Sequence, residues 1–399
     1  MKIYKVGGAV RDSLLKRSPE DTDWVVVGAN EEDLLEKGFQ RVGEDFPVFL
    51  HPRTKEEYAL ARLERKVRKG YRGFKVVTHK SVTLEEDLAR RDFTINAMAS
   101  DSTGNIIDPY SGRSDLSKCL LRHVTEAFSE DPLRVLRAAR FASKLNFSVA
   151  EETMTLMTEM AATNQLAELK EERIWSEFKK AIVTDYPLKF FKVLGKCKAL
   201  PQLFPELETL FNTLTSEESA KSYNESIRML TLIDRKNKIV REPELIFSII
   251  TRALYLHNKK NAEATASQMC SFCDRLKVPK KFKTIAKKAS AFKLIKKEFK
   301  STLGRDAIHL LDLIGGFKSD NLFPTLLFLY QIELESNYDA KAYVSRKELL
   351  AVVSAVKNMD KNDLIQQNLS GELFAEELKI RKISIANHLL THAPKPHAT

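Results

Sequence analysis

The chain has 399 residues, more than one compact domain usually needs, so we expect at least two domains with ample core. Its net charge of +11, its 30% of charged residues and its mean hydropathy of -0.30 favour a folded, soluble protein over a disordered one. No apolar run reaches 18 residues and the N-terminus lacks signal-peptide features, so neither a membrane span nor secretion is expected. Four cysteines do not make a disulfide scaffold, which predicts a reduced, cytoplasmic protein.

The first 125 residues alternate between short β-branched runs and helical stretches. Strands are expected at 2–6, 23–28, 56–62, 74–78 and 106–110, and helices at 9–16, 31–38 and 84–99. From Asp131 onward the pattern is helical almost everywhere. The fold class expected is therefore α+β, with a small mixed-sheet domain followed by an all-helical remainder.

The organisation predicted from these patterns has three parts, at residues 1–125, 126–213 and 214–399. The polar stretch 213–226 is expected to be a linker, and residues 392–399 a frayed tail.

The excess positive charge lies in the later part of the chain. Residues 1–140 carry 25 Lys and Arg against 23 Asp and Glu, a net +2, so residues 141–399 carry +9. The densest stretch, Lys280–Lys300, contains nine lysines and one acid, with apolar residues at helical spacing. It predicts an amphipathic helix whose basic face is either simply solvated or binds a polyanion.

A Gly7-Gly8 pair joins the first expected strand to the first helix. Glycines let the backbone approach a ligand closely, and helix-opening N–H groups favour phosphate, with Arg11 adding a positive charge. The alternative is a purely structural turn. The third glycine of a dinucleotide-binding fingerprint is missing.

Asp21 and Asp23 immediately precede a strongly β-branched run. If they open a strand, their side chains share one face with Cα atoms roughly 6.5 Å apart, which suits carboxylates that converge on Mg²⁺. The alternative is a solvated turn. A D-x-D motif shortly after a Gly-Gly loop resembles the arrangement of the nucleotidyltransferase fold.

Two further polar motifs complete the candidate site. Arg91, Asp92 and Asn96 are polar positions on the expected helix 84–99, and they suit either phosphate and ribose or an ion-pair network with Glu86 and Asp87. Glu130-Asp131-Pro132 opens the next helix, and Glu130 is spaced to fix Arg134.

Asp131 is either the cap of that helix or part of a base-reading pair with Arg134. As a pair, Asp131 would accept a hydrogen bond from an exocyclic amine while Arg134 donates one to the adjacent ring nitrogen. Cytosine and adenine offer that pattern, whereas guanine and uracil offer the reverse.

In order and spacing, GGAVRDSLL, DTDWVVVG, RRDFTINAMA, IIDPYSGRSDL and EDPLRVLRAARF resemble motifs of the bacterial class II CCA-adding enzymes (tRNA nucleotidyltransferases). Residues 63–74 resemble the flexible loop of that family, and 171–182 resemble its next helical motif. The resemblance implies a seahorse-like fold with a catalytic head, a nucleotide-selecting neck, and a tRNA-binding body and tail. It implies addition of CCA to tRNA from CTP and ATP, with Mg²⁺ as cofactor.

The resemblance also implies roles for particular residues. Asp21 and Asp23 would bind Mg²⁺ and catalyse, while Arg91, Asp92 and Asn96 would bind triphosphate and ribose. Asp131 and Arg134 would select C or A. Further nucleotide contacts would fall on Gly8, Arg11, Arg137 and Arg140.

One departure concerns the HD phosphohydrolase domain that many relatives append. This chain has no His-Asp dipeptide, and the corresponding segment is Phe247–Ala253, so we expect an HD-like region without metal ligands or phosphatase activity. The lone Cys270/Cys273 pair is expected to pack in a core rather than bind zinc.

Three alternatives to full CCA addition stay open at this point. They are a partial enzyme that adds only CC or A, a poly(A) polymerase of the same superfamily, and a catalytically idle tRNA-binding protein. The 63–74 loop argues against a CC-only enzyme, and retention of Asp21 and Asp23 argues against an idle one.

Overall fold

The computed structural model describes most of the chain and divides into two compact units, Met1–Glu208 and Thr209–Thr399. The described residues are 1–19, 21–43, 48–66, 74–212, 228–229, 231–232, 242–257, 262–291, 293–318, 322–337, 339–360, 362 and 371–391. The expected linker 213–226 and tail 392–399 lie outside them. The expected domain boundaries at residues 125 and 213 stay predictions. Residue 125 falls inside the first unit.

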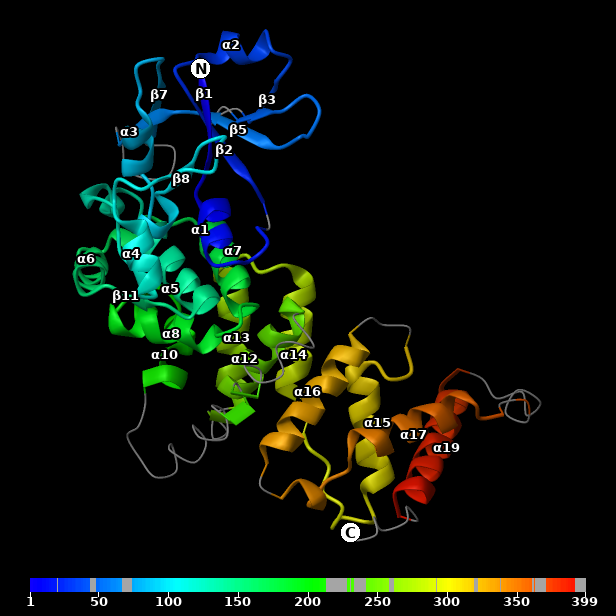
Figure 1. Cartoon of the computed structure of the whole chain (residues 1–399). Helices are drawn as coiled ribbons and strands as arrows, with labels where there is room; N and C mark the ends of the chain where they lie inside the picture. Colours follow the sequence, from blue (N-terminus) through cyan, green and yellow to red (C-terminus); the bar gives the residue numbers. More distant parts are fainter. Residues whose placement is uncertain are drawn as a thin grey trace. The chain divides into compact units, whose positions relative to one another are not determined.

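A seven-stranded mixed sheet lies at the N-terminal end of the first unit (Figure 1). Its strand order is β3-β4-β5-β2-β1-β8-β9, with β2 and β5 parallel and the other neighbours antiparallel. The strands are β1 (Lys2–Val6), β2 (Asp23–Val27), β3 (Gln40–Val42), β4 (Val48–Leu50), β5 (Glu57–Leu60), β8 (Ala99–Ser100) and β9 (Ile106–Ile107).

The two faces of this sheet bury different apolar clusters. Because side chains alternate along a strand, Val25 packs with Val6 and Leu88 on one face, while Val26 packs with Phe49 on the other. Helix α1 (Gly8–Leu14) follows β1, and α2 (Glu31–Leu35) follows β2. A separate hairpin of β6 (Arg62–Lys66) and β7 (Phe74–Thr78) holds the two arms of the expected loop, whose residues 67–73 are not described.

The single helix predicted over 84–99 is wrong. Helix α3 (Leu84–Ala89) ends early, and Thr94–Asn96 forms one separate 3₁₀ turn. Between them, the Asp92 carboxylate accepts the N–H of Phe93 at 2.9 Å, and Phe93 is extended in a bridge with His123. A short acidic side chain that captures a nearby backbone N–H competes with the helix, which explains the break.

The rest of the first unit is mainly helical, as predicted. A cluster of aromatic rings around the fully buried Phe178 ties its helices together, with Phe190, Phe191 and Phe204 as neighbours. The helices are α4 (Gly112–Ser117), α5 (Leu133–Leu145), α6 (Glu151–Ala162), α7 (Glu171–Ile182), α8 (Pro187–Lys196), α9 (Leu200–Leu203) and α10 (Pro205–Asn212), with a short parallel pair of β10 (Leu120–Leu121) and β11 (Ser148–Val149).

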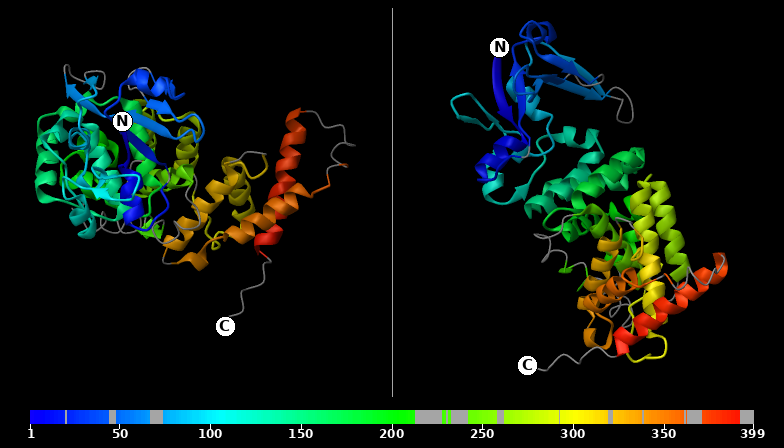
Figure 2. Two further views of the ribbon diagram at one scale, coloured as in Figure 1. Left: turned by 45° about the horizontal axis from the view of Figure 1, so that its top comes forward. Right: turned by 90° about the vertical axis from the view of Figure 1, so that its right-hand side faces the viewer.

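The described part of the second unit is built from helices. Helix α12 packs against α13, α14 and α16, and α19 packs along α15 and α17, as the views of Figure 2 allow the reader to follow. These helices are α12 (Pro243–His257), α13 (Ala262–Arg275), α14 (Lys280–Ala291), α15 (Leu303–Ile314), α16 (Phe323–Ser336), α17 (Arg346–Lys357) and α19 (Gly371–Thr391).

The segment Phe247–Ala253, which has no His-Asp pair, contributes an arginine to a buried ion pair of the second unit. Arg252 of α12 binds both carboxylate oxygens of Glu333 on α16, at 2.5 and 2.8 Å, and the two side chains are 3% and 4% exposed. A further N–H of Arg252 reaches the Ala289 carbonyl of α14 at 3.3 Å. The pair therefore joins three helices.

The basic helix predicted over 280–300 is correct only in its first part. Helix α14 ends at Ala291. Beyond it, Ile295 is buried, and its backbone carbonyl accepts the N–H of Val344 at 2.8 Å. Tertiary pairing with a distant segment overrides the helical pattern there. Several of the lysines are already paired, because Lys283 binds Asp274, Lys296 binds Glu298 and Lys297 binds Glu348.

Within the described residues, no group of three or more His, Cys, Asp or Glu side chains could hold a metal ion. Cys273 is buried and Cys270 is half-buried. Across the same residues, no helix is both long and apolar enough to cross a membrane.

Candidate active site

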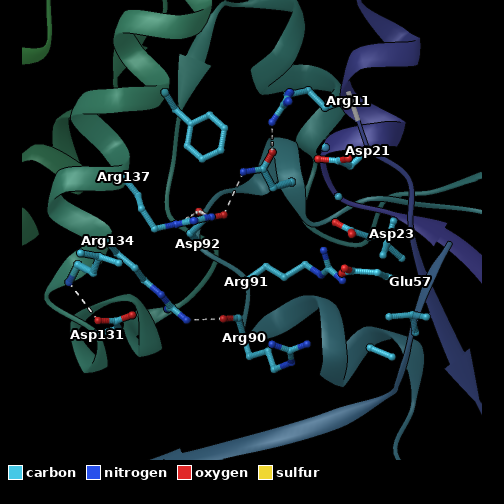
Figure 3. A pocket seen from close by; sticks show the side chains of 18 of the residues that line it. Arg11, Asp21, Asp23, Glu57, Arg90, Arg91, Asp92, Asp131, Arg134 and Arg137 are labelled. Atoms are coloured by element: carbon cyan, nitrogen blue, oxygen red, sulfur yellow. Dashed lines mark hydrogen bonds and ion pairs between the residues drawn. The ribbon is translucent and has the colours of Figure 1, made fainter. Parts of the chain in front are cut away.

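All eleven site residues predicted from the sequence line one pocket of about 720 Å³ in the first unit (Figure 3). They come from segments far apart in the sequence, namely the β1–α1 turn, the start of β2, the turn after α3 and the start of α5. The residues are Gly8, Arg11, Asp21, Asp23, Arg91, Asp92, Asn96, Asp131, Arg134, Arg137 and Arg140.

The Gly7-Gly8 turn fits closely against an arginine. Gly7 has φ +68°, and a Cβ there would lie 2.8 Å from Nη1 of Arg91, so any larger residue would be strained and would displace that guanidinium. Arg11, which is almost fully buried, donates to Asp12 at 2.8 Å and to the Asn96 side-chain carbonyl at 2.6 Å. The turn and the first helix are thus fixed to the Arg91–Asn96 segment.

Asp21 and Asp23 both border the pocket, although the strand expected to align them begins only at Asp23. Burial raises the pKa of Asp23, and the neighbouring charge of Asp21 raises it further, while Arg91 opposes both effects. A partly buried carboxylate beside a second one forms a site where a cation is electrostatically favoured. Glu57 lies opposite Asp23 in the parallel β2–β5 register and also lines the pocket (Figure 3).

A hydrogen-bonded chain crosses the floor of the pocket from α1 to α5. Arg11 donates to Asn96, the Asn96 amide donates to Asp92 at 3.0 Å, and Arg137 donates twice to Asp92 at 2.9 and 2.6 Å. Burial raises the pKa of Asp92, but the charge of Arg137 and these hydrogen bonds outweigh it and lower the pKa to about 2. The carboxylate is therefore ionised and acts only as an acceptor.

Arg91 is a partly buried cation beside the glycine turn. Its Nη2 pairs with Asp87 at 3.3 Å, and its buried Nε has no hydrogen-bond partner among the described residues. Burial lowers its pKa, against the attraction of Asp87. A buried N–H donor without a partner, in a pocket wall, favours an anionic or polar ligand at that place.

Asp131 and Arg134 are both held in place at the start of α5. The Asp131 carboxylate accepts the Leu133 N–H at 3.1 Å, so it caps a helix that begins one residue after Pro132 rather than at it. The Arg134 guanidinium donates to the carbonyl of Ala127 at 2.8 Å. It also donates to the carbonyl of Arg90 at 2.6 Å (Figure 3). The spacing along the helix predicted that Glu130 would hold Arg134. In the structure, backbone carbonyls accept these hydrogen bonds of Arg134.

Seven further charged residues of the pocket wall were not predicted as site residues. Glu57 reaches the pocket through the parallel pairing of β2 with β5, and Arg173 lies on α7, within the motif segment 171–182. The seven are Asp12, Glu57, Arg62, Arg90, Lys144, Arg173 and Lys180. With them, the described wall holds ten cationic and six acidic side chains, a balance that favours a polyanionic ligand such as a nucleoside triphosphate.

Comparisons with known proteins identify the family of this chain. Residues 3–122 match the family described as "Poly A polymerase head domain", and residues 146–211 match "Probable RNA and SrmB- binding site of polymerase A". A "Multifunctional CCA protein" of Nitrosococcus oceani is 36% identical over 394 residues, covering 96% of this chain and 97% of the relative. A "CCA-adding enzyme" of Blochmanniella pennsylvanica is 38% identical over 410 residues, covering 97% and 98%.

This chain belongs to the CCA-adding enzyme family. Solved structures show the same fold at low identity. A CCA-adding enzyme in apo form II has a TM-score of 0.67 at 21% identity, covering 98% of this chain and 90% of that chain. The Thermotoga maritima CCA-adding enzyme complexed with tRNA has a TM-score of 0.63 at 20% identity, covering 98% and 92%. The expected family, fold class and enzyme class are confirmed.

Proposed function

We propose that this chain adds C, C and A in turn to the 3′ end of tRNA, using CTP and ATP and releasing pyrophosphate. The observation that carries the proposal is the convergence of all eleven expected residues on one cation-rich pocket. Relatives named CCA-adding enzymes along nearly the whole chain support it, as do related structures in complex with ATP and with CTP.

CCA-adding nucleotidyltransferases generally depend on a divalent metal, and we propose that Asp21 and Asp23 hold Mg²⁺ here. The fit rests on the two carboxylates that line the pocket edge, where burial and the neighbouring charge of Asp21 raise the pKa of Asp23. Mg²⁺ usually takes one or two protein carboxylates and leaves its other positions to water and phosphate, so the two-carboxylate set is sufficient. When bound, the ion would favour ionisation of the tRNA 3′-hydroxyl and offset negative charge on the transferring phosphate.

The residues around the carboxylates would bind the rest of the nucleotide. Arg91 and Arg11, beside the Gly7-Gly8 turn, supply fixed positive charge for the triphosphate. Asp92 and Asn96 line the pocket, and the Asn96 amide, oriented by Asp92 and Arg11, would donate its remaining N–H to a ribose hydroxyl. Arg137 and Arg140, held by Asp92 and Glu177, extend this cationic wall along α5.

Base choice would fall to Asp131 and Arg134. Asp131 offers only acceptors while it is ionised, and Arg134 offers only donors. With both side chains fixed, the pocket edge is complementary to cytosine and adenine and mismatched to uracil and guanine. The protein thereby performs the task of a template.

The parts of the chain would divide the work. Residues 1–125 would carry the chemistry, 126–213 would select the nucleotide, and 214–399 would bind tRNA through their excess positive charge. A cytoplasmic location stays an expectation from the sequence.

A poly(A) polymerase is the second candidate, because the matched head family carries that name. The test is to sequence products after incubating tRNA that ends at the discriminator base, at C or at CC with each nucleotide. We expect C on the first two substrates, a single A on the third, and no further growth. Long A tails, or stopping after CC, would contradict full CCA addition.

A further inference from the structure

Arg173 clamps the carboxylate of Asp131 from a different helix. It lies in the first turn of α7, and its Nη2 and Nη1 donate to Oδ2 and Oδ1 of Asp131 at 3.0 and 3.3 Å. The two side chains are only 22% and 21% exposed and both line the pocket. This two-pronged geometry restrains the plane of the carboxylate as well as its position.

The clamp also limits how many hydrogen bonds Asp131 can still accept. A carboxylate offers about four lone-pair positions. The Leu133 N–H and Nη1 of Arg173 take the two on Oδ1, and Nη2 of Arg173 takes one on Oδ2. One acceptor position, on Oδ2, is left for an incoming base.

The position of Arg173 is unusual for a helix. A cation near a helix N-terminus is disfavoured by the helix dipole, so the opposite charge of Asp131 compensates for it. Helix α7 is itself fixed to α5, because its Glu177 accepts a 2.5 Å hydrogen bond from Arg140 and its Phe178 is fully buried. Arg173 therefore acts from a rigid support.

We propose that Arg173 is the positioning residue for base choice, which aims the single remaining acceptor of Asp131 at the exocyclic amine of cytosine or adenine. Arg173 acts through Asp131 and touches no reacting atom. The inference rests on the proposed role of Asp131 in base choice. Without the clamp, Asp131 would still cap α5 but its carboxylate could rotate, and discrimination against UTP and GTP would fall.

The test compares Arg173→Ala and Arg173→Lys with a matched control, Arg122→Ala. Arg122 also clamps a carboxylate in the first unit, that of Asp115 at 3.1 Å, but it does not line the pocket. The measured quantity is the ratio of kcat/KM for CTP to that for UTP on tRNA without CCA, and of ATP to GTP on tRNA ending in CC. Thermal unfolding of every variant is measured beside it.

We expect Arg173→Ala to lower both ratios by about tenfold, equivalent to roughly 1.4 kcal/mol of discrimination. Arg173→Lys should fall between this variant and the parent, because lysine keeps the charge and loses the fork. Arg122→Ala should leave both ratios unchanged. Unchanged ratios in Arg173→Ala would overturn the proposal. That outcome includes an equal loss of kcat/KM for all four nucleotides, which would show that Arg173 serves nucleotide binding or catalysis in general and not base choice.

A double-mutant cycle separates this proposal from the one beneath it. If Arg173 works through Asp131, then adding Arg173→Ala to Asp131→Ala should change the ratios no further. A further independent loss in the double variant would overturn the positioning role while leaving Asp131 as a selector. If Asp131→Ala alone kept the parent ratios, the proposed base-reading role of Asp131 itself would fail.

Discussion

Two arginine–carboxylate pairs, one in each unit, have the same chemistry and different exposure to solvent. In the first unit Arg137 binds Asp92, and its side chain is still 34% exposed to the pocket. In the second unit Arg252 and Glu333 are 3% and 4% exposed and join three helices. The comparison teaches that a charged pair facing an open pocket can serve a ligand, whereas a sealed pair can serve only the fold.

The largest effect should come from Asp21 and Asp23, the two carboxylates at the edge of the open pocket. Asp21→Asn or Asp23→Asn should lower incorporation of both C and A by about 10³-fold or more, because the site for the divalent ion loses its charge. Binding of tRNA should stay within a few-fold of the parent. Glu32→Gln, an exposed acid on α2, is the control. If either site variant kept more than a few per cent of the parent rate, the metal assignment would be wrong.

The sealed pair should affect stability and leave nucleotide choice unchanged. Arg252→Ala leaves Glu333 buried without a partner and should cost about 3–5 kcal/mol of unfolding free energy, whereas the apolar double substitution Arg252→Met/Glu333→Leu should be close to neutral. Both tryptophans, Trp24 and Trp175, lie in the first unit, so their fluorescence follows that unit while circular dichroism follows the whole chain.

In urea unfolding, the transition of the second unit should therefore move and the fluorescence transition should not. A shift of the fluorescence transition by the same amount would contradict the separation of the two units. As a control, the ratio of kcat/KM for CTP to that for UTP should be the same in both variants as in the parent.

Unfolding at acid pH tests the Arg137–Asp92 pair, which lines the pocket. The pKa of Asp92 is about 2 in the folded protein and 3.8 ordinarily, so its stabilisation is complete above about pH 4 and is lost as the pH falls toward 2. The difference amounts to roughly 2 kcal/mol. In fluorescence-detected urea unfolding from pH 5 downward, the parent should lose more stability than Asp92→Asn. Parallel pH curves would show that the carboxylate is not held in this way.

The smallest effect should come from single charges on the second unit. Lys287 and Lys293 are exposed, and no ion pair joins them to the described part of the chain, unlike Lys296 and Lys297. Reversing Lys287 and Lys293 to Glu should weaken tRNA binding and reduce the slope of log affinity against log salt by about one unit per lysine. If the variant kept the parent's slope of log affinity against log salt, the RNA contact would lie elsewhere. Lys287 and Lys293 would then be only solvated.

Sequence patterns predicted most of the elements, because local signals determine them. Alternating β-branched runs predicted β1 and β2, and the Gly-Gly, D-x-D and Glu-Asp-Pro motifs located residues that meet in one pocket. What failed depended on contacts between distant segments. The helix through Asp92 breaks where Phe93 pairs with His123, and the helix beyond Ala291 ends where Ile295 pairs with Val344.

The supporting residues of the site were also beyond sequence reasoning. Arg173 reaches Asp131 across 42 residues, and Arg90 reaches Arg134 across 44, through contacts that no local spacing reveals. Glu57 enters the pocket only through the parallel pairing of β5 with β2. Spacing along a helix instead favoured Glu130 for Arg134, which shows how a plausible local partner can be displaced by backbone groups brought near by the fold.

Nucleotide competition in the Asp131→Ala/Arg134→Ala variant tests the central claim most directly, namely that side chains of this pocket choose the base. The measurement is incorporation of UTP against CTP, and of GTP against ATP, into tRNA lacking CCA and tRNA ending in CC. Each mismatch leaves polar groups unpaired at a cost of roughly 1–3 kcal/mol, so removing both side chains should bring the ratios down by at least tenfold while addition continues at a reduced rate. If the double variant excluded UTP and GTP as strongly as the parent, base choice would lie elsewhere and Asp131 would be only a helix cap.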